Sequence, residues 1–111
     1  MKKTVTFCGR EMTLESNALL PRQYRHMFGR DLIVDMKQMV REHKEGAEVI
    51  NVEPLENITW LMFRAAGEDV GESVEDWLGS IDDSMAIYSI INDVVDLWMA
   101  SQKTTALPKK K

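Results

Sequence analysis

The sequence predicts a mainly α fold, a small helical domain of about five helices with an N-terminal β-hairpin. Near the N-terminus, apolar and polar residues alternate, as they do in a strand with one buried face. Further along, apolar residues recur at the spacing of one helix face. The chain has 111 residues, 44% hydrophobic and 29% charged, which is typical of a folded chain with one modest core.

The alternation at the N-terminus predicts a β-hairpin at residues 4–14. Its apolar side consists of Val5, Phe7, Met12 and Leu14. The stretch CGRE between the two arms supplies a turn, since Gly9 can take a positive φ without steric cost. Two strands alone are marginally stable in water, so this apolar side is expected to pack on helices or on another chain.

A first helix is predicted from about Ser16 or Asn17 to Gly29, with Pro21 in its first turn. Its inward stripe is Leu20, Tyr24 and Phe28. Proline costs little in a first turn because the N–H that it lacks has no helical partner there. Gly29 is expected to end the helix as a left-handed cap.

Asp31 is expected to cap a second helix that continues to about His43. The apolar stripe of this helix is Leu32, Met36, Met39 and Val40. The residues expected to face water are Asp35, Lys37, Gln38 and Arg41. A polar break follows, and residues 49–53 are predicted to form a short extended segment.

Three more helices are predicted in the second half of the chain. Pro54 opens one that Gly67 ends, and Ser73 with Asp76 forms a capping box for a short one. The last begins near residues 82–84, whose carboxylates suit the positive end of a helix dipole. Residues 1–101 are thus expected to form a single domain, and residues 102–111 a flexible basic tail.

No catalytic, cofactor or metal motif is evident. Cys8 is not near His26 or His43 in the sequence, and there is no glycine-rich phosphate loop, nucleophile elbow or HExxH segment. The acidic pairs at 75–76 and 82–83 more often cap helices than hold a cation. We therefore expect a protein that is not an enzyme and has no cofactor and no metal.

The charges divide the chain into a basic and an acidic part. Residues 22–44 are rich in Lys and Arg, whereas residues 65–102 contain acids and no Lys or Arg. This pattern is consistent with two solvated faces, with head-to-tail self-association, or with a partner of matching polarity. The net charge of −4 argues against a general nucleic-acid binder. No apolar stretch is long enough for a signal peptide or a membrane span, so we expect a cytoplasmic protein.

Residues 20–43 also permit a helix-turn-helix interpretation. A reading helix would present Lys37, Gln38 and Arg41 to base edges. However, Asp31 and Asp35 would then lie in its first turns and repel phosphate. A small DNA-binding regulator is the alternative that this pattern leaves open.

Several motifs together resemble the tail assembly chaperone family of long-tailed phages and prophages. The matching positions are Ser16, Asn17, Ala18, Pro21, Tyr24, Arg25, Phe28, Gly29, Asp31 and Leu32, then Trp77 and Leu78, then Leu97 and Trp98. The resemblance covers roughly residues 4–105 and is structural rather than catalytic. Leu19-Leu20 departs from the small residue and threonine cap expected there, which leaves the start of the first helix open.

The resemblance implies a non-enzymatic role in the bacterial cytoplasm. Such proteins bind the long, helical tape-measure protein, keep it soluble and help the tail tube protein polymerise, and they are absent from the finished virion. Many occur in a short and a frameshift-extended form. Lys109-Lys110-Lys111 would be encoded by an adenine-rich run suited to ribosomal slippage, or is simply a solubilising basic tail.

The residues expected to contact a partner are Arg22, Arg25, Met39, Trp60, Trp98 and Met99. Met and Trp side chains adapt to varied apolar surfaces, and three tryptophans are many for so small a core. Tyr24 and Phe28 are expected to point inward and build a tight helical corner. Arg22 and Arg25 would stay on the surface, available to acidic neighbours or to the acidic half of a second copy.

Overall fold

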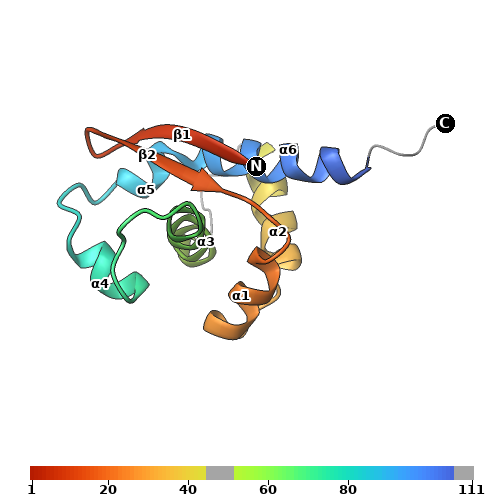
Figure 1. Ribbon diagram of the computed structural model, residues 1–111, viewed down its shortest axis with the longest axis horizontal. Coiled ribbons are helices and arrows are strands. Elements are labelled where there is room, and N and C mark those ends of the chain that lie inside the picture. The colour runs from red at the N-terminus through yellow and green to blue at the C-terminus, as the bar shows by residue number, and fades with distance from the viewer. Residues whose placement is uncertain (45–51, 107–111) are drawn as a thin grey trace.

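The computed structural model describes residues 1–44 and 52–106, the last four as backbone only. It places an antiparallel pair of strands, β1 (Lys2–Phe7) and β2 (Arg10–Glu15), before six helices in this part of the chain (Figure 1). The helices are α1 (Leu20–Phe28), α2 (Leu32–Lys44), α3 (Val52–Ala65), α4 (Val74–Gly79), α5 (Ala86–Ser89) and α6 (Ile91–Ala106). The predicted mainly helical fold with an N-terminal hairpin is confirmed.

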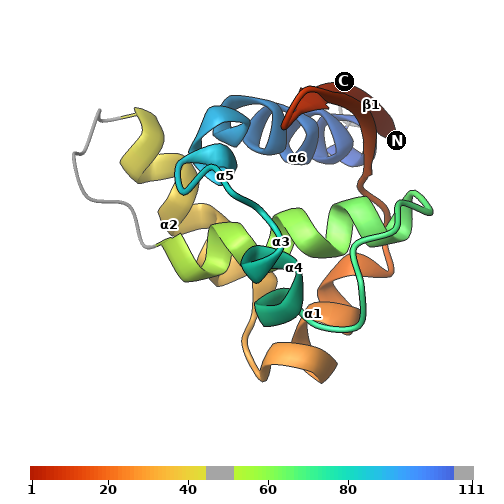
Figure 2. The same ribbon diagram turned by 90° about the vertical axis from the view of Figure 1, so that its left-hand side faces the viewer.

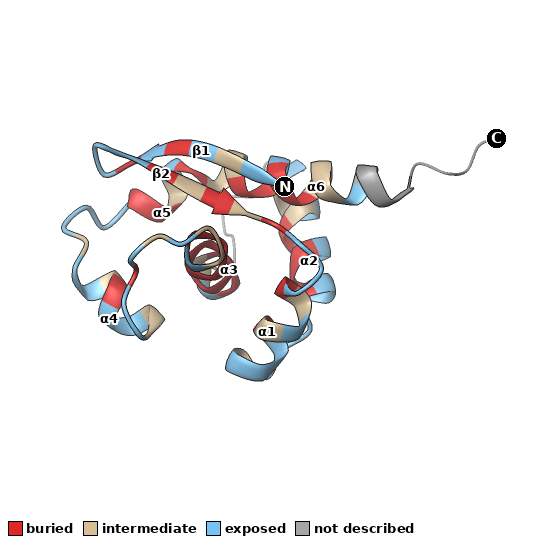
Figure 3. Cartoon of the chain, viewed as in Figure 1, coloured by how far each residue is buried: buried red, intermediate tan, exposed pale blue. Residues whose placement is uncertain are grey.

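Helix α3 is the centre of the fold, because β2, α1, α2, α4 and α5 all contact it. Figure 1 shows it end-on beneath the hairpin. Leu55 and every residue from Asn57 to Phe63 are buried, so the helix is enclosed on all sides along this stretch (Figure 3). The hairpin lies over α3 through β2 and reaches α6 through β1.

The predicted hairpin forms, but it is longer than residues 4–14, because Arg10 and Glu11 belong to β2 rather than to the turn. Phe7 pairs with Arg10, which leaves Cys8 and Gly9 as a two-residue turn with φ values of 53° and 78°. Positive φ at both positions matches the right-handed twist of the two strands. The predicted apolar side, Val5, Phe7, Met12 and Leu14, is buried against the helices.

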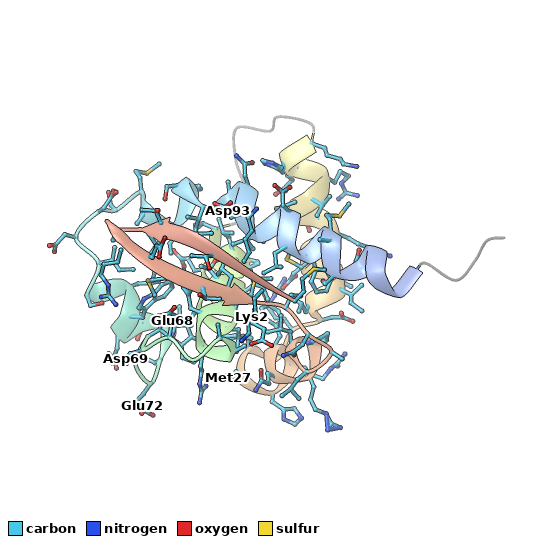
Figure 4. The ribbon with its side chains drawn as sticks, turned by 45° about the horizontal axis from the view of Figure 1, so that its top comes forward. Lys2, Met27, Glu68, Asp69, Glu72 and Asp93 are labelled. Carbon is cyan, nitrogen blue, oxygen red and sulfur yellow. The ribbon has the colours of Figure 1, made fainter. Side chains whose placement is uncertain are left out.

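Contacts from the helical part cover both edges of the hairpin. On the outer edge of β2, the carboxylate of Glu68 accepts a hydrogen bond from the Thr13 backbone N–H at 2.7 Å (Figure 4). On the β1 side, Lys3 Nζ lies 3.2 Å from Asp93 Oδ1 of α6. An uncovered edge would expose backbone groups to pairing with other chains, and these contacts reduce that exposure.

Helix α1 begins at Leu20, later than predicted. Ser16 instead extends the hairpin, since its N–H donates to the Met1 carbonyl at 2.8 Å. Asn17 Oδ1 accepts from the Leu19 N–H at 2.9 Å and so shapes the turn before the helix. Pro21 does lie in the first turn, as predicted.

Gly29 ends α1 in the left-handed conformation, with φ 68°, as predicted. A Cβ at this position would meet nothing within 4 Å, so a side chain would cost conformational energy rather than cause a clash. Gly29→Ala is expected to lower the free energy of unfolding by about 1 kcal/mol in urea denaturation. Gly79→Ala, at a glycine without positive φ, is the matched control and should have no such cost. Equal losses in both variants would contradict this explanation.

Two other caps agree with the sequence. Ser73 Oγ accepts from the Asp76 N–H at 3.1 Å at the start of α4. Asp31 Oδ1 accepts from the Ile33 N–H at 2.9 Å at the start of α2. Both bonds satisfy backbone donors that a helix N-terminus leaves unpaired.

The remaining boundaries differ from the predicted ones. The single last helix is two helices, because Ile90 leaves helical geometry with φ −117° and ψ 16°. Helix α6 then continues to Ala106, so residues 102–106 are helical rather than a tail, and residues 107–111 lie outside the described part. Helix α3 begins at Val52, so the last two residues of the predicted extended segment 49–53 are helical. The first three residues of that segment lie outside the described part.

No helix in the described ranges has the length and apolar character needed to cross a membrane.

Candidate functional site

A groove of about 440 Å³ lies between α2 and α6. Its lining residues are Lys37, Val40, Arg41 and Lys44 from α2, and Trp98, Met99 and Gln102 from α6. We call it the α2/α6 groove. Apolar side chains come from both helices, and the charged lining residues among those described are all cations.

The spacing of residues along α2 produces this arrangement. Lys37, Arg41 and Lys44 follow one another at helical intervals, so they form a basic stripe along one face. Met36 and Met39, on the neighbouring face, are buried against the rest of the fold. Val40 lies between the two faces and is half-buried, which places an apolar side chain beside the basic stripe.

Helix α6 supplies the other wall of the groove. Trp98 is buried, with 7% of its surface exposed, and it still contributes to the lining. Met99 is half-buried beside it. An indole held by the core offers a partner a flat apolar surface at little cost in side-chain entropy.

The cations of the groove have no acidic partner in the described part of the chain. None of the ion pairs formed there involves Lys37, Arg41 or Lys44. All three are exposed. The groove therefore has a positive rim that an acidic segment would complement.

The structure brings together two of the six residues predicted to contact a partner. Trp98 and Met99 both line the groove. Met39 and Trp60 are core residues, with 3% and 0% of their surface exposed, and the indole N–H of Trp60 donates to the Val70 carbonyl at 3.0 Å. Neither therefore presents a surface to a partner in the structure, and their role as partner contacts stays a prediction.

Arg22 and Arg25 are exposed on α1, as expected, but they do not line the groove. Arg25 Nη2 lies 3.7 Å from Asp31 Oδ2. Lys37 and Arg41 were expected to face water, or to read bases in the helix-turn-helix alternative, and not to line a protein-binding groove. Their helical spacing beside Val40 is the signal that would have indicated one.

Asp35 is the clearest correction in this region, because it was expected to face water and is buried, with 6% of its surface exposed. Its Oδ2 accepts hydrogen bonds at 2.8 Å from both Tyr24 Oη and Arg30 Nε, and its Oδ1 accepts one from Arg30 Nη2 at 2.8 Å. The hydrogen bonds from Arg30 lower the pKa of Asp35. Burial, together with the bond to Asp35, raises the pKa of Tyr24. The trio joins α1, the turn and α2.

The predicted inward packing of α1 is confirmed. Tyr24 is fully buried, and its ring centroid lies 5.2 Å from that of Phe28. Phe28 in turn lies 6.4 Å from the Trp60 ring, edge to face. The segment from Pro21 to Gly29 therefore builds a helical corner against α3, with its arginines left on the surface.

Within the described ranges, no group of three or more His, Cys, Asp or Glu side chains is placed to hold a metal ion. Helices α1 and α2 are joined by a short turn, as the helix-turn-helix alternative requires, and that alternative stays a prediction. Comparison with protein-family models, curated proteins and solved structures found no match to the chain.

Proposed function

We propose that this chain is a phage or prophage tail assembly chaperone that binds the tape-measure protein, keeps it soluble and assists tail tube polymerisation, without catalysing a reaction. The observation that carries the proposal is the α2/α6 groove, with apolar Val40, Trp98 and Met99 beside cations that form no ion pair with any described residue. The resemblance of the motifs around Tyr24 and Trp77 supplies the identity of the partner.

A groove of this kind suits a partner that presents amphipathic helices. A helix laid along it would bury apolar side chains against Trp98 and Met99, and each leucine-sized side chain would contribute about 2 kcal/mol. Methionine is flexible, so the same groove can accept different sequences along a long partner. Many copies bound side by side would shield apolar stripes that otherwise aggregate.

Coexpression tests the proposal directly. The wild-type chain is expected to raise the soluble fraction of the tape-measure protein encoded downstream, measured by centrifugation and gel densitometry. Lys37→Glu/Arg41→Glu reverses the charge of the groove rim and should return most of that protein to the pellet. Arg22→Glu/Arg25→Glu makes an equal charge change at the two predicted contact residues outside the groove, and it distinguishes binding at α1 from binding at the groove. Lys2→Glu/Arg10→Glu, an equal charge change on exposed hairpin residues outside the groove, is the matched control.

Two results would count against this assignment. If the tape-measure protein stays equally insoluble with and without the wild-type chain, the chaperone role fails. If the Arg22/Arg25 variant loses activity and the groove variant keeps it, the partner binds at α1 instead. Retention on duplex DNA that weakens steeply with salt would favour the small DNA-binding phage regulator, whose reading helix would be α2 with Lys37 and Arg41 exposed.

The proposed frameshift concerns Lys109 to Lys111, which lie outside the described residues. Its test is the gene sequence. An unbroken adenine run followed by an open frame past the stop codon would support slippage, and a run broken by guanines would leave the solubilising tail as the explanation.

A further inference from the structure

A second, larger opening lies among α1, α3 and α4, which Figure 2 shows next to one another. It measures about 790 Å³ and is lined by Met27, Phe28, Arg30, Glu53, Glu56, Asn57, Val74, Glu75 and Leu78. We call it the acidic cleft. It has no lining residue in common with the α2/α6 groove.

The cleft has an excess of negative charge. Among the described residues that line it, the one cation is Arg30, which already donates two hydrogen bonds to Asp35 at 2.8 Å each. Glu53, Glu56 and Glu75 form no ion pair with any described residue. Burial and the nearby charge of Glu53 raise the pKa of Glu56, and a cation entering the cleft would offset this rise by stabilising the ionised carboxylate.

Asn57 adds a polar side chain to the cleft whose hydrogen-bonding groups no described residue satisfies. The residue is buried, with 7% of its surface exposed, and its side-chain amide forms no hydrogen bond with the described part of the chain. Every side-chain nitrogen or oxygen in that part that is completely shielded from solvent has a hydrogen-bond partner. The unpartnered Asn57 amide is therefore not completely shielded, and it meets solvent at the cleft that it lines. An amide of this kind can donate two hydrogen bonds and accept two, and a ligand would satisfy them.

Apolar side chains accompany these polar groups. Phe28, Val74 and Leu78 are half-buried, and Met27 is 44% exposed. A small inorganic cation would leave this apolar surface uncovered. A ligand that covers it must be apolar on one side and basic on the other.

We propose that the acidic cleft binds a basic amphipathic segment of a partner protein. Lysine or arginine side chains of the segment pair with Glu53, Glu56 and Glu75, its apolar side chains cover Phe28 and Leu78, and a polar group bonds to Asn57. This site goes beyond the proposed chaperone groove, which favours acidic segments. One copy of the chain can then hold two segments of opposite charge.

The test uses the full chain and two fluorescein-labelled helical peptides, one with leucine and lysine faces and one with glutamate in place of each lysine. Whereas any binding of the glutamate peptide is expected at the α2/α6 groove, fluorescence anisotropy should show binding of the lysine peptide to the cleft. Glu56→Gln/Glu75→Gln should weaken it about tenfold, and Asn57→Ala about threefold or more. Lys37→Gln/Arg41→Gln, in the groove, is the matched control and should leave it unchanged.

Two outcomes would overturn the proposal: no binding of the lysine peptide, or unchanged affinity for that peptide in Glu56→Gln/Glu75→Gln. Circular dichroism of each variant confirms that it is folded, and the exposed Glu75→Gln alone is the variant least able to disturb folding. The coexpression assay depends on the α2/α6 groove and not on the acidic cleft. Failure of the cleft therefore leaves the chaperone role standing, and failure of the chaperone role leaves the cleft standing.

Discussion

Trp60→Ala is expected to lower the free energy of unfolding by about 4 kcal/mol. Trp60 is fully buried on the central helix, and its ring packs edge to face with Phe28. Its N–H donates to the Val70 carbonyl, and the Arg64 guanidinium lies 5.1 Å from the ring centroid. Alanine would leave a cavity at the centre of the fold and remove the link to the α3–α4 loop.

Urea denaturation followed by circular dichroism measures this loss. Domains of this size have a free energy of unfolding of about 5–15 kcal/mol. The variant should therefore unfold at a clearly lower urea concentration than the wild-type chain. Trp60→Phe keeps most of the volume and removes the hydrogen bond, which separates the two effects. Met85→Ala, at a side chain 59% exposed, should change little. A loss below about 1 kcal/mol in Trp60→Ala would contradict the central role given to α3.

Asp35→Ala is expected to cost about 3 kcal/mol of unfolding free energy, since it leaves the buried Tyr24 hydroxyl and the Arg30 guanidinium without their partner. Tyr24→Phe removes one hydrogen bond of the trio and should cost about 1 kcal/mol. Asp96→Ala is the control, since this carboxylate is 70% exposed in a pair with Lys3 at 3.9 Å and should matter little. Similar losses in the Asp35 and Asp96 variants would contradict the importance of burial.

The same trio predicts how stability depends on pH. Because the pKa of Asp35 lies below its ordinary value of 3.8 in the folded state, the unfolded chain takes up this proton first as the pH falls. The stabilisation is therefore complete above the ordinary value and is lost as the pH falls through the lower folded pKa. The Asp35→Ala variant should lose this part of the destabilisation at low pH. If the melting temperature of the variant falls with decreasing pH as steeply as that of the wild-type chain, this role of Asp35 is contradicted.

The elements that the sequence predicted best are those whose signals are local. The alternation around Val5 and Leu14 identifies the buried side of the hairpin without knowledge of the helices. The left-handed Gly29 and the Ser73 cap each depend on a few neighbouring residues. Such features follow from backbone sterics and short-range hydrogen bonds, which a single sequence contains.

The errors concern residues whose role is decided by distant parts of the chain. Asp35 looks like a solvent-facing acid on its helix, and only the approach of Tyr24 and Arg30 makes its burial favourable. The backbone leaves helical geometry at Ile90 although the apolar pattern continues through this residue, and the sequence offers no glycine or proline there as a signal. The groove joins Lys37 with Trp98, and no local pattern links two positions so far apart.

The turn of the hairpin provides a single site for chemical labelling. Cys8 is the one cysteine of the sequence, and it is exposed at a position with φ 53°. It lines neither the groove nor the cleft. A thiol-reactive dye therefore attaches at one defined point on the surface and leaves both openings free, so that binding of a peptide to either can be followed on the labelled chain.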